Sequence, residues 1–154
     1  MSQRLEFGKI EPAAYQSMMG LEQYLAQSGF SKKLKHLIKL RASQINGCAF
    51  CIDMHTKEAR ADGETEQRLY ALTVWSETPF FTPEERAALA LTEAVTQIHK
   101  QGVPDAIYDL ASQYFTPAAV TQILMTIVTI NAWNRIAITT QMIPGSYQVT
   151  ESIH

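Results

Sequence analysis

The chain has 154 residues, of which 46% are hydrophobic and 18% are charged, a composition typical of a globular protein with one core. Thirteen basic against fifteen acidic residues give a formal net charge of -2, which excludes a general electrostatic attraction to nucleic acid or to an anionic membrane surface. Two cysteines are too few for a secreted disulfide framework, and the N-terminal residues lack the apolar run of a signal peptide, so we expect a single cytoplasmic domain over residues 1–154.

The apolar residues of the N-terminal half recur at helical spacing. The pattern predicts helices over about residues 11–27, 31–46, 48–61 and 65–75. Gly47 is expected to end the second helix directly before the third begins, because glycine commonly terminates helices.

The C-terminal half carries two clear helix-start signals. Residues 82–85 (TPEE) form a capping box with proline at the first helical position, which predicts a long helix from Pro83 to about Lys100. A shorter helix is expected over residues 105–114, and a threonine-proline pair then predicts a last long helix that begins at Pro117.

This last helix carries an uncharged run from Pro117 to Asn134 that is nearly long enough to span a bilayer. Threonine, glutamine and asparagine interrupt the run, which favours a core or subunit-contact helix over a membrane span. Alternating strand patterns are nearly absent, so we expect an all-α bundle of about six to seven helices with loose ends near residues 1–10 and 144–154. So apolar a helix would leave apolar surface exposed in a monomer, which predicts a homo-oligomer.

Both cysteines lie in the stretch QINGCAFCIDMH, residues 44–55, with a histidine four residues after the second. On a helix, residues three, four and seven apart share one face, so Cys48, Cys51 and His55 are expected to form a single row. The helix terminus favours a thiolate at Cys48, whereas the proximity of His55 favours one at Cys51.

Two thiols on one helical turn can close a short disulfide, which predicts a thiol–disulfide cycle without a bound cofactor or metal. Two other interpretations stay open. A zinc site would use the same three side chains but needs a fourth ligand, and the remaining histidines show no paired spacing. The cysteines could also be buried apolar residues beside a capping histidine. Covalent haem attachment is excluded because Ile52, not histidine, follows the second cysteine.

Three segments resemble the AhpD-like alkylhydroperoxidases of the carboxymuconolactone decarboxylase superfamily. These segments are Leu37–Arg60 with the two cysteines, Leu69–Thr96, and Ile130–Ile138. The resemblance implies an all-α fold assembled into trimers or hexamers that reduces hydroperoxides in antioxidant defence, with re-reduction by a lipoyl-type or other thiol donor. It also implies that Cys51 attacks the peroxide, that Cys48 resolves the intermediate and that His55 relays the proton.

The chain departs from the family pattern at one position. The family usually has a glutamate twelve residues before the first cysteine, and His36 stands there in this sequence. A histidine can relay protons but does not provide a permanent carboxylate, so Glu93 is a second candidate for the relay. The alternatives to a peroxidase are a zinc-binding or redox-sensing module without enzymatic activity and the lactone decarboxylase activity of the wider superfamily, which does not require a cysteine pair.

Overall fold

The computed structural model describes residues 2–149 of the chain, and the regular structure in that range is entirely helical. In chain order the elements are α1 (Phe7–Ile10), α2 (Pro12–Gln27), α3 (Lys32–Asn46), α4 (Ala49–Ala61), α5 (Glu66–Ala71), the 3-10 helix η1 (Leu72–Glu77), α6 (Pro83–Thr96), α7 (Ile98–Gln101), α8 (Asp105–Tyr114) and α9 (Pro117–Thr140). The predicted all-α class is therefore confirmed. Of the nine α-helices in the described range, α1 and α7 are single turns of four residues.

The predicted start and stop signals are confirmed where they set the limits of α3 and α6. The hydroxyl of Ser31 accepts a hydrogen bond from the backbone N–H of Leu34, which caps α3. Thr82 and Glu85 form the predicted reciprocal capping box at the start of α6. Gly47 ends α3 in the left-handed conformation, with φ 71°, a geometry that costs glycine little because it has no Cβ.

Two helices differ from the predicted ones. The expected helix from Pro83 to Lys100 is interrupted at Gln97, so that α7 forms a separate turn. The expected helix over residues 65–75 tightens into η1 after Ala71, and Val74 leaves helical geometry altogether. Hydrophobic spacing does not reveal the break at Val74, because Leu72 and Trp75 on either side of it still pack in the core. In α7 the only apolar residue, Ile98, is exposed.

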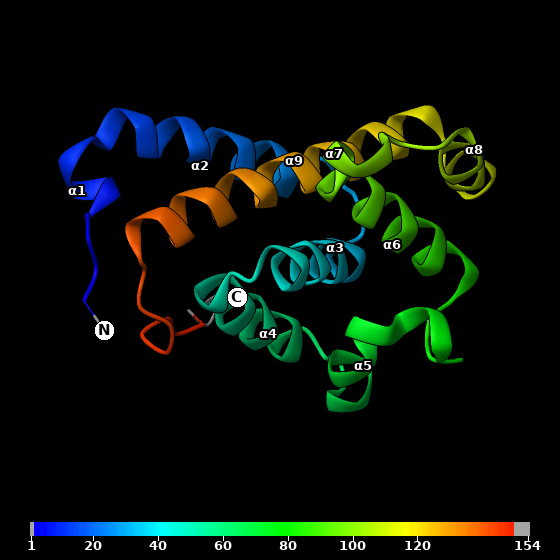
Figure 1. Ribbon diagram of the computed structural model, residues 1–154, viewed down its shortest axis with the longest axis horizontal. Helices are drawn as coiled ribbons and strands as arrows, with labels where there is room; N and C mark the ends of the chain where they lie inside the picture. The colour runs from blue at the N-terminus through cyan, green and yellow to red at the C-terminus, as the bar shows by residue number, and fades with distance from the viewer. Residues whose placement is uncertain (1, 150–154) are drawn as a thin grey trace.

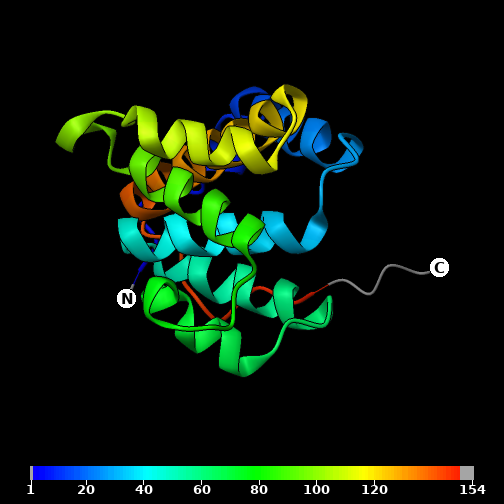
Figure 2. The same ribbon diagram turned by 90° about the vertical axis from the view of Figure 1, so that its right-hand side faces the viewer.

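Helix α3 is the central element of the bundle (Figure 1). It packs against α4, α6 and α9, while α2 runs along α9 on the other side. Figure 2 shows the same arrangement from the side, with α6 crossing α3. The main core is formed by fully buried aliphatic side chains from α3, α6 and α9, among them Leu37, Ile38, Leu89, Ile123 and Ile127. Burial of each such side chain stabilises the fold by about 2 kcal/mol.

Two asparagines of α9 form hydrogen bonds inside the bundle. The side-chain amide of Asn46 on α3 donates to the amide oxygens of both Asn131 and Asn134, at 2.9 and 2.8 Å. Asn134, fully buried, donates in turn to the hydroxyl of Ser43.

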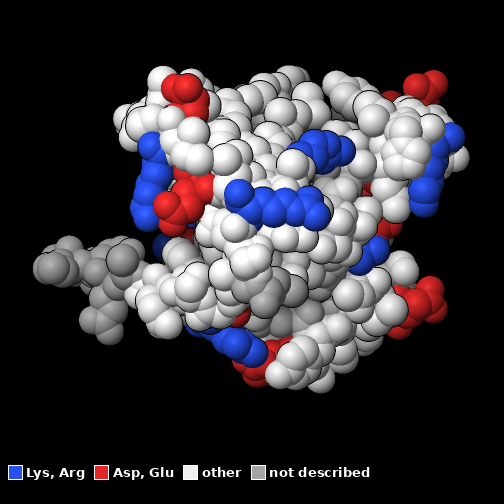
Figure 3. Space-filling model, turned by 60° about the vertical axis from the view of Figure 1, so that its left-hand side comes forward, with Lys and Arg blue, Asp and Glu red and all other residues white. Residues whose placement is uncertain are grey.

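Within residues 2–149 no helix combines the length and hydropathy needed to cross a membrane. On the face shown in Figure 3, basic and acidic side chains form small separate groups with broad uncharged surface between them.

Parts of both chain ends contact other elements of the fold. Residues 7–10 form the helical turn α1, and the backbone N–H of Arg4 donates to the carbonyl of Thr140. Beyond α9, the chain lies against α4, where Asp53 accepts the N–H of Gly145. These contacts join segments far apart in sequence, which local patterns cannot report. Residue 1 and residues 150–154, part of the same predicted loose ends, lie outside the described residues.

Candidate redox site

Cys48 and Cys51 are joined by a disulfide, and their Cα atoms are 5.3 Å apart. The turn at Gly47 brings the chain from α3 directly into α4 and makes Cys48 the N-cap of that helix. The Cys48 sulfur also accepts the backbone N–H of Cys51, at 3.4 Å. A sulfur in this position faces the positive end of the helix dipole, which stabilises a thiolate when the disulfide is reduced.

The disulfide is buried at an apolar contact among α3, α4 and α9. Cys48 is 1% exposed and Cys51 is 4% exposed. Buried aliphatic residues surround the two sulfurs, with larger partly buried side chains outside them: Ala42, Ile130 and Ala137, then Phe50, Trp133 and Met142. Such a setting protects the pair from bulk water and strengthens electrostatic interactions nearby.

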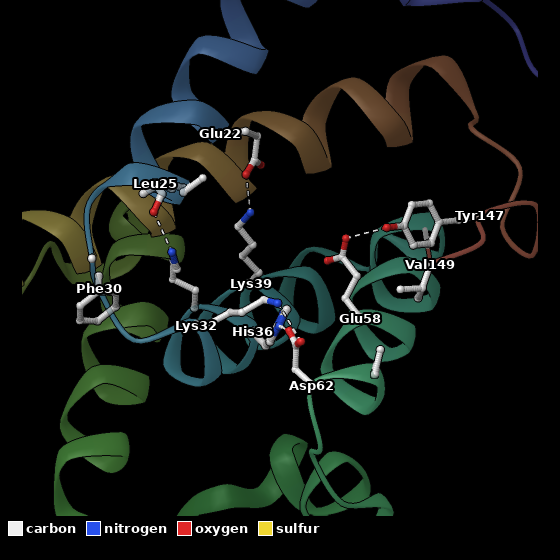
Figure 4. Close-up of a pocket in the computed structure, with 14 residues that line it drawn as sticks. Glu22, Leu25, Phe30, Lys32, His36, Lys39, Glu58, Asp62, Tyr147 and Val149 are labelled. Carbon is white, nitrogen blue, oxygen red and sulfur yellow. Dashed lines mark hydrogen bonds and ion pairs between the residues drawn. The ribbon is translucent and has the colours of Figure 1, made fainter. Parts of the chain in front are cut away.

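His55 lies one helical turn after Cys51 and is only 3% exposed. Its Nδ1 is 2.9 Å from Oε2 of Glu58, on the same helix. The other oxygen of Glu58 accepts a hydrogen bond from the hydroxyl of Tyr147, at 2.8 Å (Figure 4). Glu58 thus orients the imidazole through Nδ1, and Tyr147 of the C-terminal segment orients Glu58.

The charge states of these three groups follow from their surroundings. Burial lowers the pKa of His55, and this outweighs the hydrogen bond and the charge of Glu58, which act to raise it. For Glu58, burial acts to raise the pKa, but hydrogen bonds from His55 and Tyr147 and the nearby positive charges hold that pKa at about 2. Burial and the adjacent carboxylate raise the pKa of Tyr147 to about 12. At neutral pH, Glu58 is therefore an anion that accepts a hydrogen bond from the Nδ1–H of a neutral imidazole. This leaves Nε2 as the basic nitrogen.

Glu58 and Tyr147 are absent from the residues that the sequence alone suggested. Glu58 had a usable signal, because it follows His55 by three residues and so shares its helix face. Tyr147 had none, since its contact joins residues 89 positions apart.

A cavity of about 1040 Å³ opens beside Glu58 and Tyr147, between α2, α3, α4 and the C-terminal segment (Figure 4). Glu58 and Tyr147 form one part of its wall. Glu22 and Lys39 form another, as an ion pair with a separation of 2.6 Å. The second oxygen of Glu22 accepts a hydrogen bond from the indole N–H of Trp133. Trp133 packs against the buried apolar residues around the disulfide, here called the disulfide cluster. The cavity and the disulfide are therefore linked through side chains of α2 and α9 as well as through His55.

No group of three or more histidine, cysteine or acidic side chains is placed to hold a metal ion within the described part of the chain. The three side chains considered for zinc are otherwise engaged in this structure. Cys48 and Cys51 bond to each other, and the Nδ1 of His55 is occupied by Glu58.

Comparison with known proteins gives the family. Residues 12–94 match the model of the carboxymuconolactone decarboxylase family. The chain belongs to that family. It is 46% identical over 138 residues to the uncharacterized protein YdfG of Bacillus subtilis, a match that spans 90% of this chain and 94% of YdfG.

Two solved structures have the same fold as this chain. Protein ATU0492 of Agrobacterium tumefaciens, of unknown function and provisionally described as the antioxidant defence protein AhpD, has a TM-score of 0.92 at 42% identity, over 95% of this chain and all of the other. An uncharacterized peroxidase-related protein of Ralstonia eutropha, described as an alkylhydroperoxidase AhpD core, has a TM-score of 0.80 at 20% identity, over 91% of this chain and 75% of the other. This second likeness shows the fold alone. The resemblance to AhpD-like proteins is thereby confirmed.

His36, at the position of the usual family glutamate, lies on α3 in the wall of the cavity. Its Nε2 is 2.5 Å from a carboxylate oxygen of Asp62, whose other oxygen accepts from Lys32. The structure thus brings His36 to the C-terminal end of α4, two turns beyond His55 and on the same side of that helix as Glu58 and the cavity.

Glu93 takes part in a different polar contact. Its Oε1 accepts hydrogen bonds from the guanidinium of Arg41, at 2.8 Å, and from the indole of Trp75, at 2.7 Å. This contact joins α3, η1 and α6, whereas the disulfide cluster joins α3, α4 and α9. The relay role of Glu93 in this family member stays a prediction, as does that of His36.

Proposed function

We propose that this chain is a thiol-dependent peroxidase or disulfide oxidoreductase of the AhpD type, acting on hydroperoxides in cytoplasmic antioxidant defence. One observation carries the proposal: a disulfide between Cys48 and Cys51 lies one helical turn from a buried imidazole whose Nδ1 is held by Glu58. The provisional description of ATU0492 as an antioxidant defence protein supports the same reaction class.

The proposed cycle begins with the two cysteines reduced. Nε2 of His55 takes the proton of the Cys51 thiol, and the thiolate attacks the distal oxygen of the hydroperoxide. The O–O bond breaks, Cys51 becomes a sulfenic acid, and the alkoxide leaves as an alcohol after it takes a proton. The Cys48 thiol then attacks the Cys51 sulfur, which forms the disulfide and releases water.

A dithiol, of lipoyl type or on another thiol carrier, completes the cycle. Its thiolate attacks one sulfur of the disulfide to form a mixed disulfide, and its second thiol then displaces the protein thiolate. The donor is oxidised to a disulfide and both cysteines are reduced, so two electrons pass from donor to peroxide in each turnover. The N-cap position of Cys48 supports its role as the leaving thiolate in this half of the cycle.

Serine substitutions test the proposal through a single turnover of the pre-reduced protein without added donor. Cys51→Ser should consume no peroxide, whereas Cys48→Ser should consume one equivalent and leave a sulfenic acid that dimedone traps. Ala49→Ser, at an exposed position in the same turn, is the matched control and should behave as the wild type. Unchanged peroxide consumption in both cysteine variants would overturn the proposal, and the opposite pattern would assign the attack to Cys48.

A further inference from the structure

The cavity beside Glu58 and Tyr147 is lined by charged side chains of both signs. Its basic side chains are Lys32, Lys35, His36 and Lys39, which follow one another along a single face of α3. Its acidic side chains, on α2 and α4, are Glu22, Glu58 and Asp62.

Nearly all of these groups are already matched to a partner of opposite charge or to a strong donor. Asp62 accepts from Lys32 at 2.8 Å and faces His36. Glu22 pairs with Lys39. The two oxygens of Glu58 are hydrogen-bonded to His55 and to Tyr147. These contacts leave no carboxylate of the cavity wall for Lys35.

Lys35 differs from the other basic side chains in its hydrogen-bond partner. Its ammonium donates to the backbone carbonyl of Leu25, at 2.7 Å, near the C-terminal end of α2. Burial and the neighbouring charges of Lys39 and Lys32 lower its pKa, although Glu22 acts to raise it. An additional negative charge near the Lys35 ammonium would therefore stabilise its protonated form.

The rest of the wall is apolar. Leu25, Ala26, Phe30, Ala61 and Val149 contribute side chains to the same cavity. A cavity of this volume that combines aliphatic and aromatic lining with a lysine bonded only to a backbone carbonyl suits a ligand with an apolar body and a single negative charge.

We propose that this cavity binds an organic carboxylate with an apolar body and that Lys35 is the residue that pairs with its charge. Through Glu58 and the Glu22–Lys39 pair, the bound molecule lies against the residues that support His55 and Trp133 (Figure 4). The carboxylate is carried by one of the two reactants, the hydroperoxide or the dithiol donor. This last assignment rests on the proposed function, whereas the binding itself does not.

Binding is tested first, on the Cys48→Ser, Cys51→Ser protein, so that the result is independent of any turnover. Calorimetric titration should show that octanoate binds and that the neutral octanamide binds about tenfold more weakly. Lys35→Met keeps the aliphatic stem and should weaken octanoate binding about tenfold without changing octanamide binding. Lys35→Arg should retain octanoate binding, and Lys33→Met, at an exposed position on the same helix, is the matched control.

Two results would overturn the binding site: no heat of octanoate binding, or equal binding by octanoate in wild type and in a folded Lys35→Met variant. Circular dichroism confirms that each variant is folded.

In the active protein, octanoate should then slow one half-reaction competitively. Slower thiol oxidation by peroxide identifies a carboxylated hydroperoxide, and slower disulfide reduction identifies a carboxylated dithiol. No effect on either half-reaction would refute the assignment of the ligand as a reactant.

Discussion

Glu58 Oε2 lies 2.9 Å from Nδ1 of His55, three residues earlier on the same helix, and this contact fixes which imidazole nitrogen can act as a base. Replacing Glu58 by glutamine should keep the shape of the side chain but remove the charge that orients and stabilises the imidazole. We expect the rate of peroxide-dependent thiol oxidation to fall about tenfold or more, given the usual contribution of general acid–base catalysis. Stopped-flow measurement of thiol loss checks this, with the exposed Glu77→Gln as control. An unchanged rate would exclude Glu58 from the relay.

Tyr147 should influence the same pair from the C-terminal segment. Tyr147→Phe removes the hydroxyl that donates to Glu58 at 2.8 Å, so the pKa of Glu58 should rise above its value of about 2. Because Tyr147 is only half-buried, we expect the free energy of unfolding to fall by about 1 kcal/mol. NMR titration of the Glu58 carboxyl and urea unfolding measure the two effects. The adjacent exposed Gln148→Ala should change neither, and an unchanged Glu58 pKa in Tyr147→Phe would contradict the assignment.

Two fully buried threonines should respond oppositely to the same substitution. The hydroxyl of Thr129 has no hydrogen-bond partner within the described residues, whereas that of Thr92 donates to the carbonyl of Ala88 at 2.7 Å. Thr129→Val should therefore leave stability unchanged or raise it, because valine buries a methyl group in place of an unsatisfied hydroxyl. Thr92→Val should cost about 1 kcal/mol. Urea unfolding of both variants compares them directly, and a larger loss in Thr129→Val would contradict the expectation.

Stability should decrease in acid through His55. Its native pKa lies below the ordinary value of 6.5, so from about pH 6.5 downward the unfolded chain binds a proton that the native protein does not. The free energy of unfolding should therefore fall as the pH decreases from 6.5 toward the native pKa, and Glu58 should add a second loss between its ordinary pKa of 4.5 and about 2. Urea unfolding across pH measures both. His55→Gln should remove the upper loss, whereas His99→Gln, at an exposed site, should not.

The oligomer predicted from the sequence remains a proposal with a specific surface to test. Leu124, Val128 and Ile138 lie along one side of α9 and are 42%, 44% and 45% exposed. Apolar side chains in such a row are typical of subunit contacts. Analytical ultracentrifugation should give a mass of three or six chains, and Leu124→Asp combined with Val128→Asp should reduce it. Tyr70→Asp, at a 71% exposed site elsewhere, should not. A wild-type mass of 17.3 kDa would refute the prediction.

Local sequence was enough for the limits of α3, for the start of α6 and for the spacing of the two cysteines and His55. Ser31 and Gly47 limit α3, and the capping box at Thr82 starts α6, because each signal acts on backbone groups within four residues of itself. The spacing of Cys48, Cys51 and His55 placed the last two on α4 and the first at its N-cap for the same reason, since helical geometry sets which neighbours share a face.

What surrounds that row was decided by tertiary structure. The contact of Tyr147 with Glu58, the pairing of Glu22 with Lys39 and the binding of Glu93 by Arg41 and Trp75 each join different elements of the chain. Which acidic side chain supports the imidazole, and which is used elsewhere, depends on how the helices cross. The sequence by itself determined most helix starts and the spacing of the cysteine pair through short-range geometry. The charge states and the cavity depend on burial and on charges that only packing brings together.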